Sequence, residues 1–247
     1  MSDDTFEMKP KKIYRGAFDY FREGTIYAQE TFEVFKNKKN FTTHYSSELL
    51  SRVSTGELLK ITVDYKVDKD FVPTTVKIHK LLGKDFCHET FKYSNKTSTL
   101  TYIIESNEGK KKMTISSSPK FHITTPTATT SILYFLVKKF DGNSKNMYNS
   151  INTINEWSFK EAPKNGIIQM EKISVTSEEI KVGTASVQAV QYKVCNGDHA
   201  NKEDKFNKKA PAARVFLSSH GAIPYIIEDS HGGKIAIRYL NNLQEES

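Results

Sequence analysis

The chain has few cysteines and no long apolar run. Its 247 residues include two cysteines, Cys87 and Cys195, which lie far apart in the sequence. The spacing leaves one disulfide open, but two buried thiols in a reducing compartment are the commoner arrangement. The longest apolar run, from Ile132 to Val137, is too short to cross a bilayer. A membrane-spanning helix is therefore not expected.

The N-terminus lacks the features of a secretory signal. Residues 1–7 are acidic and contain no apolar core of the kind that such a signal needs. We therefore expect a cytoplasmic protein on the sequence as given, and a periplasmic one if the chain is a processed form.

Recognised catalytic, cofactor and metal motifs are also missing. There is no G-x-S-x-G elbow, no H-E-x-x-H, no P-loop and no G-x-G-x-x-G. Cys195 and His199 lie four residues apart in a polar stretch, but no second pair stands at metal-ligand spacing. Cys87 and His88 are neighbours, and neighbours on a strand point to opposite faces. We expect no catalytic residue, no cofactor and no metal site.

The remaining histidines and carboxylates do not pair by spacing. His220 and His231 each precede a glycine and are expected in hairpin turns. These turns lie at opposite ends of the strand between them, which argues against a shared site. Several carboxylates are expected on solvated faces, namely those of Glu48, Glu57, Asp64 and Glu105.

Lysine supplies most of the positive charge, and arginine is scarce. The formal net charge is +7 and the sequence pI is about 9.1, a balance that suits a nucleic acid or an anionic membrane as partner. The lysines, however, form short clusters where turns or tails are expected, which is their usual solvating position. Because arginine makes most base-specific contacts, we expect no specific nucleic-acid partner. The clusters are Lys9, Lys11 and Lys12; Lys36, Lys38 and Lys39; Lys110, Lys111 and Lys112; and Lys205, Lys208 and Lys209.

Alternation of apolar and polar residues predicts β-strands along most of the chain. Hydrophobic residues make up 37% and aromatic residues 11% of the sequence, which is enough to bury a core. In the clearest strand, 59–67, Ile61, Val63 and Tyr65 lie on one face and polar residues lie on the other. Residues 214–240 contain three short apolar runs separated by two breaks with glycine, which is typical of an antiparallel meander.

The segment 126–140 has a different pattern. It begins with Pro126 and has Thr127 or Thr130 as a candidate cap and two lysines near its end, and this predicts a helix. Its apolar residues lie on several sides, so such a helix should be surrounded by the rest of the fold. A short buried strand is the competing interpretation, because periodicity alone does not exclude it.

These patterns predict a mainly β protein with a single strongly curved antiparallel sheet, an open or partial barrel, wrapped around one central apolar helix. We expect a disordered lead-in at 1–12 and a single β-rich domain at 13–243. The parts of this domain are a first half at 13–123, the central helix at 126–140, a second half at 156–240 and a polar loop at 196–212. After an Asn-rich connector at 143–155, strands are expected at 156–159, 166–171, 179–182 and 185–194.

Several stretches resemble a known group of proteins. They are Arg15–Tyr20 with Gly24–Val34, Asp64–Pro73, Thr124–Leu133 and Val215–Pro224. In these stretches the chain is similar to uncharacterised bacterial β-rich proteins that are likened to the lipoprotein carriers and receptors of the bacterial envelope, the LolA/LolB-like fold. The resemblance implies a curved sheet that closes around a helix and leaves an apolar concavity for acyl chains. The chain departs from the group in its missing export signal and in the insertion at 196–211.

We therefore expect a non-catalytic protein that binds an apolar or amphiphilic, lipid-like molecule in this concavity. The side chains expected to line it are Tyr65, Tyr102, Tyr134, Phe135, Trp157 and Tyr239. A cofactor-independent enzyme that uses the same cavity is the first alternative, with His44, His79 and Glu48 as the residues to test. Weak nucleic-acid binding through the lysine clusters is the second. We expect a monomer that makes transient contact with a membrane surface.

Overall fold

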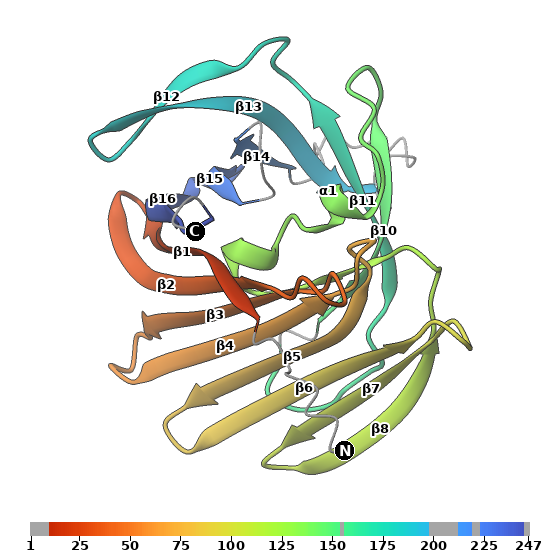
Figure 1. The fold of residues 1–247 in the computed structure, drawn as a ribbon. Helices are drawn as coiled ribbons and strands as arrows, with labels where there is room; N and C mark the ends of the chain where they lie inside the picture. Colours follow the sequence, from red (N-terminus) through yellow and green to blue (C-terminus); the bar gives the residue numbers. More distant parts are fainter. Residues whose placement is uncertain (1–9, 154–155, 198–211, 219–222, 245–247) are drawn as a thin grey trace, which may run out of the picture.

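The computed structural model describes residues 10–153, 156–197, 212–218 and 223–244. In these residues one large, mostly antiparallel sheet of 16 strands forms nearly the whole fold, accompanied by one short helix (Figure 1). The mainly β fold class expected from the sequence is therefore confirmed. Within the same residues, no helix is both long enough and apolar enough to cross a membrane.

The elements form two groups of strands separated by a helical segment. The first strands are β1 (Lys11–Arg22), β2 (Thr25–Lys36), β3 (Thr43–Arg52), β4 (Leu58–Val67), β5 (Pro73–Leu82), β6 (Asp85–Ser94), β7 (Thr99–Ser106), β8 (Gly109–Ser116) and β9 (His122–Thr124). A 3₁₀ turn, η1 (Ala128–Thr130), and a one-turn helix, α1 (Tyr134–Val137), follow. The later strands are β10 (Asn146–Asn152), β11 (Asn165–Lys172), β12 (Glu178–Val182), β13 (Ala185–Asn196), β14 (Ala212–Leu217), β15 (Pro224–Asp229) and β16 (Gly233–Asn242).

The two groups meet where the first and last strands pair. The order across the sheet is β8-β7-β6-β5-β4-β3-β2-β1-β16-β15-β14-β13-β11-β10-β9, and β12 pairs with β13 beside this path. Consecutive strands therefore pair as hairpins up to β8, and β16 joins the two groups by pairing with β1. The pairing of β9 with β10 is parallel, and the other pairings are antiparallel.

The long strands show the alternation of buried and more exposed residues that the sequence predicts. In β4, Ile61, Val63 and Tyr65 are buried, while the residues between them are half-buried. The β1–β2 hairpin turns at Glu23 and Gly24, which have φ of 50° and 77°. A glycine adopts this left-handed conformation without the steric cost that a side chain brings. The last three strands form the meander that the C-terminal sequence predicts.

The helix predicted at 126–140 is largely wrong, because the segment contains only η1 and α1. Threonine side chains of this segment hydrogen-bond locally instead, including Thr127 Oγ1 with Thr130 Oγ1 at 3.0 Å and Thr125 with Thr130. Such bonds compete with the backbone ladder of a helix, and β-branched threonine is itself a weak helix former. At the other end Lys138 is already extended, so the helix stops at Val137.

A buried carboxylate fixes this segment to the sheet. Glu30 of β2 is fully buried, and its side chain accepts hydrogen bonds from the backbone N–H groups of Ala128, at 2.8 Å, and Thr129, at 3.2 Å. The hydroxyl groups of Thr129 and Tyr20 donate to the same carboxylate, each at 2.5 Å. Burial raises the pKa of Glu30, and these donors oppose that rise. Four donors thus compensate for removing one carboxylate from water.

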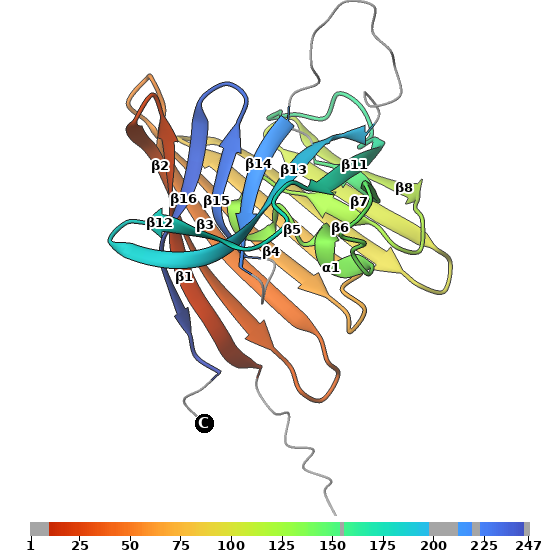
Figure 2. The same ribbon diagram turned by 90° about the horizontal axis from the view of Figure 1, so that it is seen from above.

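The fixed segment lies between two apolar clusters. The side chain of Leu133 belongs to the large cluster formed with β1–β7, whereas its neighbours Ile132 and Tyr134 belong to a second cluster. The other members of that cluster are Tyr148, Met170, Tyr192, Val215 and Leu217. Figures 1 and 2 show η1 and α1 between β2–β5 on one side and β13–β16 on the other.

Two expectations for the second half need correction. The connector at 143–155 contains a strand, β10, in which Tyr148 and Ser150 are buried. In the sequence, the many asparagines of this connector hide the alternation of buried and exposed positions. The strand expected at 156–159 is absent, since this stretch bends without pairing to a neighbour. The lead-in at 1–12 and the loop at 196–212 lie mostly outside the described residues, although β1 already begins at Lys11.

Replacing Glu30 should test how strongly this carboxylate holds the fold. We expect Glu30→Ala to lower the free energy of unfolding by about 3 kcal/mol, because it leaves buried N–H groups without an acceptor. Urea unfolding followed by circular dichroism measures this loss. Glu48→Ala is the matched control, since Glu48 forms a half-exposed ion pair with Lys60 on β4. Its loss should stay below about 1 kcal/mol, and equal losses for the two variants would contradict the role given to Glu30.

Candidate ligand-binding site

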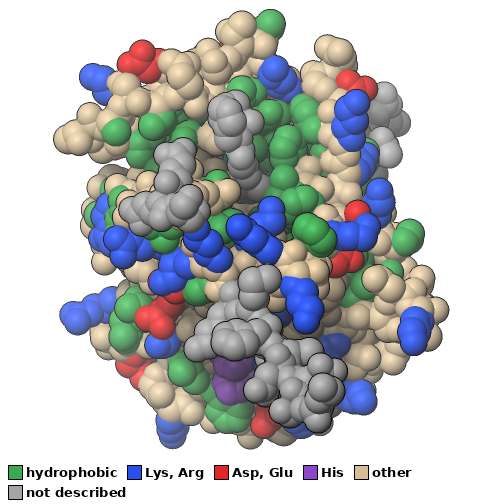
Figure 3. Space-filling model, in the orientation of Figure 1, with side chains coloured by type: hydrophobic (Ala, Val, Ile, Leu, Met, Phe, Trp, Pro, Cys, Tyr) green, Lys and Arg blue, Asp and Glu red, His purple; other side chains and the backbone are tan. Residues whose placement is uncertain are grey.

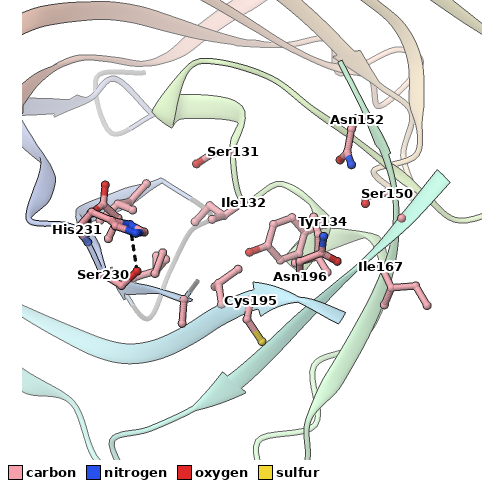
Figure 4. A pocket seen from close by; sticks show the side chains of 18 residues that line it. Ser131, Ile132, Tyr134, Ser150, Asn152, Ile167, Cys195, Asn196, Ser230 and His231 are labelled. Carbon is pink, nitrogen blue, oxygen red and sulfur yellow. Dashed lines mark hydrogen bonds between the residues drawn. The ribbon is translucent and has the colours of Figure 1, made fainter. Parts of the chain in front are cut away.

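An apolar cavity of about 370 Å³ lies beside the helical segment, in the second half of the sheet (Figure 4). Its apolar walls come from the helical segment and from β11, β13, β14 and β15. The residues that line it are Ser131, Ile132, Tyr134, Ser150, Asn152, Gly166, Ile167, Ile168, Val194, Cys195, Asn196, Ala212, Ala213, Val215, Ile227, Asp229, Ser230 and His231. This volume lies in the range of small-molecule sites.

Tyr134 brings a polar atom to this apolar space. Its side chain is buried, and its hydroxyl group has no hydrogen-bond partner among the described residues. In Figure 4 the hydroxyl oxygen points between Ile132 and Cys195. Burial raises the pKa of Tyr134, so the hydroxyl stays protonated at neutral pH and can donate a hydrogen bond.

The ring of Tyr134 is held in place by other aromatic residues. His122 lies edge-on to it with ring centroids 5.2 Å apart, and Tyr148 is tilted against it at 5.1 Å. Tyr148 also has a buried hydroxyl without a partner in the described residues, but it lines a smaller hollow on the other side of Tyr134. Burial raises the pKa of Tyr148 to about 12.

His122 is a second buried polar residue behind the cavity. Its Nδ1 lies 3.1 Å from the hydroxyl oxygen of Tyr65, which also accepts the backbone N–H of Ile123 at 3.0 Å. The tautomer of the imidazole decides which of these two atoms donates and which accepts. Nε2 has no partner among the described residues. Burial lowers the pKa of His122 to about 3, so the ring is neutral at physiological pH.

One rim of the cavity is the turn between β15 and β16. Asp229 accepts the backbone N–H groups of His231, at 2.7 Å, and Gly233, at 2.9 Å, and these bonds lower its pKa. Ser230 Oγ lies 3.3 Å from His231 Nδ1. This carboxylate therefore holds the turn, and the imidazole of His231 remains exposed at the rim. His220, which the sequence placed in the preceding turn, lies outside the described residues.

The structure does not bring the six predicted lining residues together. Tyr134 lines the cavity, and Phe135 packs beside it against Phe140 and Tyr192. Tyr65 and Tyr102 are fully buried in the large cluster, and their hydroxyl groups bind His122 and Glu89.

The other two predicted lining residues are exposed. Trp157 is 37% exposed, and Tyr239 is 43% exposed at a polar hollow on another face of the sheet.

The residues proposed for an enzyme lie away from this cavity. His44 Nε2 is 2.8 Å from Asp64 Oδ1, and this bond lowers the pKa of Asp64. Glu48 pairs with Lys60, and His79 stacks on His88 with centroids 4.3 Å apart. All of these residues belong to β3–β6 and none lines the cavity. Among the residues that the structure describes, no group of three or more histidine, cysteine or carboxylate side chains forms a metal site.

Both cysteines are free thiols, in agreement with the commoner of the two arrangements considered. Cys87 is buried in the large cluster, where burial raises its pKa, and Cys195 lines the cavity. His88, the sequence neighbour of Cys87, stacks on His79 instead of serving as its base.

Sequence reasoning overlooked Glu30 and His122, but a signal existed for one of them. In β2 the alternation places Glu30 on the same face as Ala28, Phe32 and Val34. The sequence therefore has a carboxylate on a face whose other residues are buried. Such a residue requires buried donors. His122 lies in a strand of only three residues, β9, and no periodicity identifies so short an element.

The fold and the cavity define a mainly β protein with a small apolar site inside it. The chain matches no protein-family model and no curated protein sequence. It is similar to the crystal structure of a β-barrel-like protein of a domain of unknown function, DUF1849, from Brucella abortus. The TM-score is 0.53 at 10% identity, over 94% of this chain and 98% of that one.

A DUF1089 family protein from Pseudomonas aeruginosa is similar with a TM-score of 0.50 at 8% identity, over 83% of this chain and 90% of the other. These likenesses support the resemblance to uncharacterised β-rich bacterial proteins. At such low identity they concern the fold alone, and neither description names a lipoprotein carrier.

The buried neutral His122 should make the fold sensitive to acid. The folded pKa is about 3 and the ordinary value is 6.5, so between these values the unfolded chain binds a proton that the folded chain does not. Stability is therefore lost as the pH falls from about 6.5 towards 3, by up to about 1.4 kcal/mol per pH unit. Urea unfolding at pH 7, 6, 5 and 4 measures the slope.

Two variants distinguish the contribution of His122 to the acid sensitivity from the contribution of other titrating groups. We expect His122→Gln to flatten the dependence between pH 6 and 4, while the same change at exposed His231 keeps the wild-type slope. A wild-type slope in His122→Gln would show that the acid sensitivity comes from other residues.

Proposed function

We propose that the protein binds an apolar or amphiphilic small molecule without changing it chemically, in the cavity between the helical segment and the second half of its sheet. The observation that carries the proposal is the apolar cavity whose wall includes Tyr134, a residue with a buried, unpartnered hydroxyl. Apolar walls with one or two placed polar groups are the usual composition of small-molecule sites.

The unpartnered hydroxyl narrows the chemistry of the ligand. A buried donor without an acceptor costs about 1–3 kcal/mol, and an acceptor atom on the ligand recovers part of this cost. The residues that line the cavity also include Asn152, Asn196 and Ser230, whose neutral side chains suit an uncharged polar end of the ligand. The ligand that fits best is a short apolar molecule with one hydrogen-bond acceptor, such as a carbonyl or ether oxygen.

The proposal includes a curved, partly closed sheet, as in an open barrel. Residues far apart in the sequence support this shape, since η1 contacts β3 and β9 contacts β5. A sheet that closes around the helical segment shields the cavity from water on several sides. The resemblance to lipoprotein carriers implies the same arrangement, in which the ligand is an acyl chain.

No arrangement of the described residues favours catalysis in this cavity. Asp229 is used by the turn, the thiol of Cys195 has no base beside it, and the ring of His122 is behind Tyr134. Binding is therefore the function proposed for this site.

A pair of tyrosine variants tests the proposal. We expect the wild-type chain to bind 2-octanone, a neutral ketone, and Tyr134→Phe to bind it about fivefold more weakly, because one hydrogen bond is lost. Tyr148→Phe is the matched control, since its hydroxyl is also buried and unpartnered but lines the other hollow. Isothermal titration calorimetry measures the affinities.

Native mass spectrometry of the freshly purified chain is the complementary experiment. We expect it to detect a small bound molecule that organic extraction removes. A ligand-free mass, together with no heat of binding for the ketone, would contradict the proposal. Equal weakening by the two tyrosine variants would place the ligand elsewhere.

A further inference from the structure

A second and larger cavity, of about 700 Å³, lies at the opposite end of the later strands. The first cavity contacts β13 and β14 at Cys195 and Ala212, which pair with each other. The second contacts β13 at Val187 and the chain beyond β14 at Ser218. The two cavities thus occupy opposite ends of β13 and β14, and on β15 they approach each other, at Ile227 for the first and Tyr225 for the second.

The wall of the second cavity is mainly apolar. The contributing side chains come from both halves of the sheet and from α1, and they include Ile13, Val34, Phe71, Leu136, Val187 and Tyr225. Most of them also pack against the large apolar cluster. An alkyl chain in this space would replace water against a surface that is already apolar.

The mouth of this cavity is basic. An adjoining hollow of about 330 Å³ shares Ile13, Lys36 and Gln244 with it and is also lined by Lys11 and Lys38. No aspartate or glutamate is among the described residues that line either space. The structure gives none of these three lysines an ion-pair partner among the described residues, whereas Lys12 nearby is paired with Glu33. Three cations with no acidic side chain among the described residues that line these two spaces attract an anion.

Figure 3 shows one face of the molecule. Hydrophobic side chains gather in its upper middle, and a band of lysine and arginine side chains crosses below them. Both chain ends of the described sheet, the start of β1 and the end of β16, lie at this mouth, since Tyr14 pairs with Asn242 and both line the cavity.

Two loop residues at the same mouth are held in an unusual backbone conformation. Phe41 has φ of 56° and lines the adjoining hollow, and Phe71 has φ of 60° and lines the cavity. Bulky residues rarely adopt this left-handed conformation, and such strain gathers at functional sites. At this mouth the left-handed conformation keeps one aromatic ring in the cavity and one in the adjoining hollow. Phe41 remains 60% exposed beside the lysines.

We infer that this cavity is a second binding site, which takes a single-chain amphiphile with an anionic head. The alkyl chain lies in the 700 Å³ cavity, and the carboxylate or phosphate head lies among Lys11, Lys36 and Lys38. The lysine stems also cover apolar surface while their ammonium groups face the head group. This site goes beyond the proposed function, which concerns a neutral ligand in the first cavity.

Amphiphiles with the same twelve-carbon chain and different heads test the charge preference. Titration calorimetry of the full chain, below the micelle concentration, compares dodecanoate and dodecyl phosphate with dodecyltrimethylammonium. We expect one anion to bind per chain, about tenfold more tightly than the cation, because the lysines attract one head and repel the other. The tighter of the two anions identifies the head group. Equal affinity for the anions and the cation would overturn the inference.

A double variant locates the head group. We expect Lys36→Gln with Lys38→Gln to weaken dodecanoate binding about fivefold. Lys84→Gln with Lys96→Gln, which removes the same charge at exposed turns that line neither space, is the control and should leave the affinity unchanged. Equal weakening by the two double variants would show a general effect of net charge, and the inference would fall.

Two further measurements separate this site from the first cavity and from a membrane surface. Ala213→Trp, which fills the first cavity, should abolish 2-octanone binding and leave dodecanoate binding intact. Loss of dodecanoate binding in this variant would place both ligands in the first cavity and overturn the second site. Co-sedimentation with phosphatidylglycerol vesicles, without stoichiometric binding of either free anion, would also overturn it in favour of a membrane surface.

Discussion

The organisation of this protein depends on the carboxylate of Glu30, which is buried on β2 and binds two backbone N–H groups of a distant segment. A carboxylate in such a place is stable only if donors surround it, and the donors come from β1 and from the turn η1. Because the hydrogen bonds join residues about a hundred positions apart, they fix the helical segment at one point of the sheet. Apolar packing alone has no direction and would not select that point.

The segment fixed in this way contributes side chains to two spaces with different chemistry, Ile132 and Tyr134 to the first cavity and Leu136 to the second. Among the described residues, one space is lined by Tyr134 and by no lysine or arginine, whereas the other opens at three lysines and is lined by no acidic side chain. The neighbours Ile132 and Leu133 contribute to different apolar clusters, so the segment belongs to both halves of the core. A small change in its position would therefore alter both spaces together, and this makes the anchoring carboxylate relevant to binding as well as to stability.

The strands could be predicted from the sequence, but most of the site could not. Alternation in β4 and the glycine breaks near the C-terminus identify strands because burial on one face leaves a period of two. The same logic fails in the connector that contains β10, where asparagine occupies buried and exposed positions alike. The helix expected at 126–140 was too long, because apolar spacing does not reveal the side-chain bonds of the threonines. The cavity linings come from strands far apart in the sequence, and only Tyr134 among the expected residues lines the first cavity.

The two solved structures compared with this chain have descriptions that name domains of unknown function, so the functional account depends on this chain's own residues. Native-state hydrogen exchange at the amides of Ala128 and Thr129 tests its central claim most directly. If Glu30 fixes the segment, these two protons exchange only when the whole domain unfolds, with the same free energy as global unfolding. Exchange within seconds, through a local opening that leaves the sheet intact, would contradict the account.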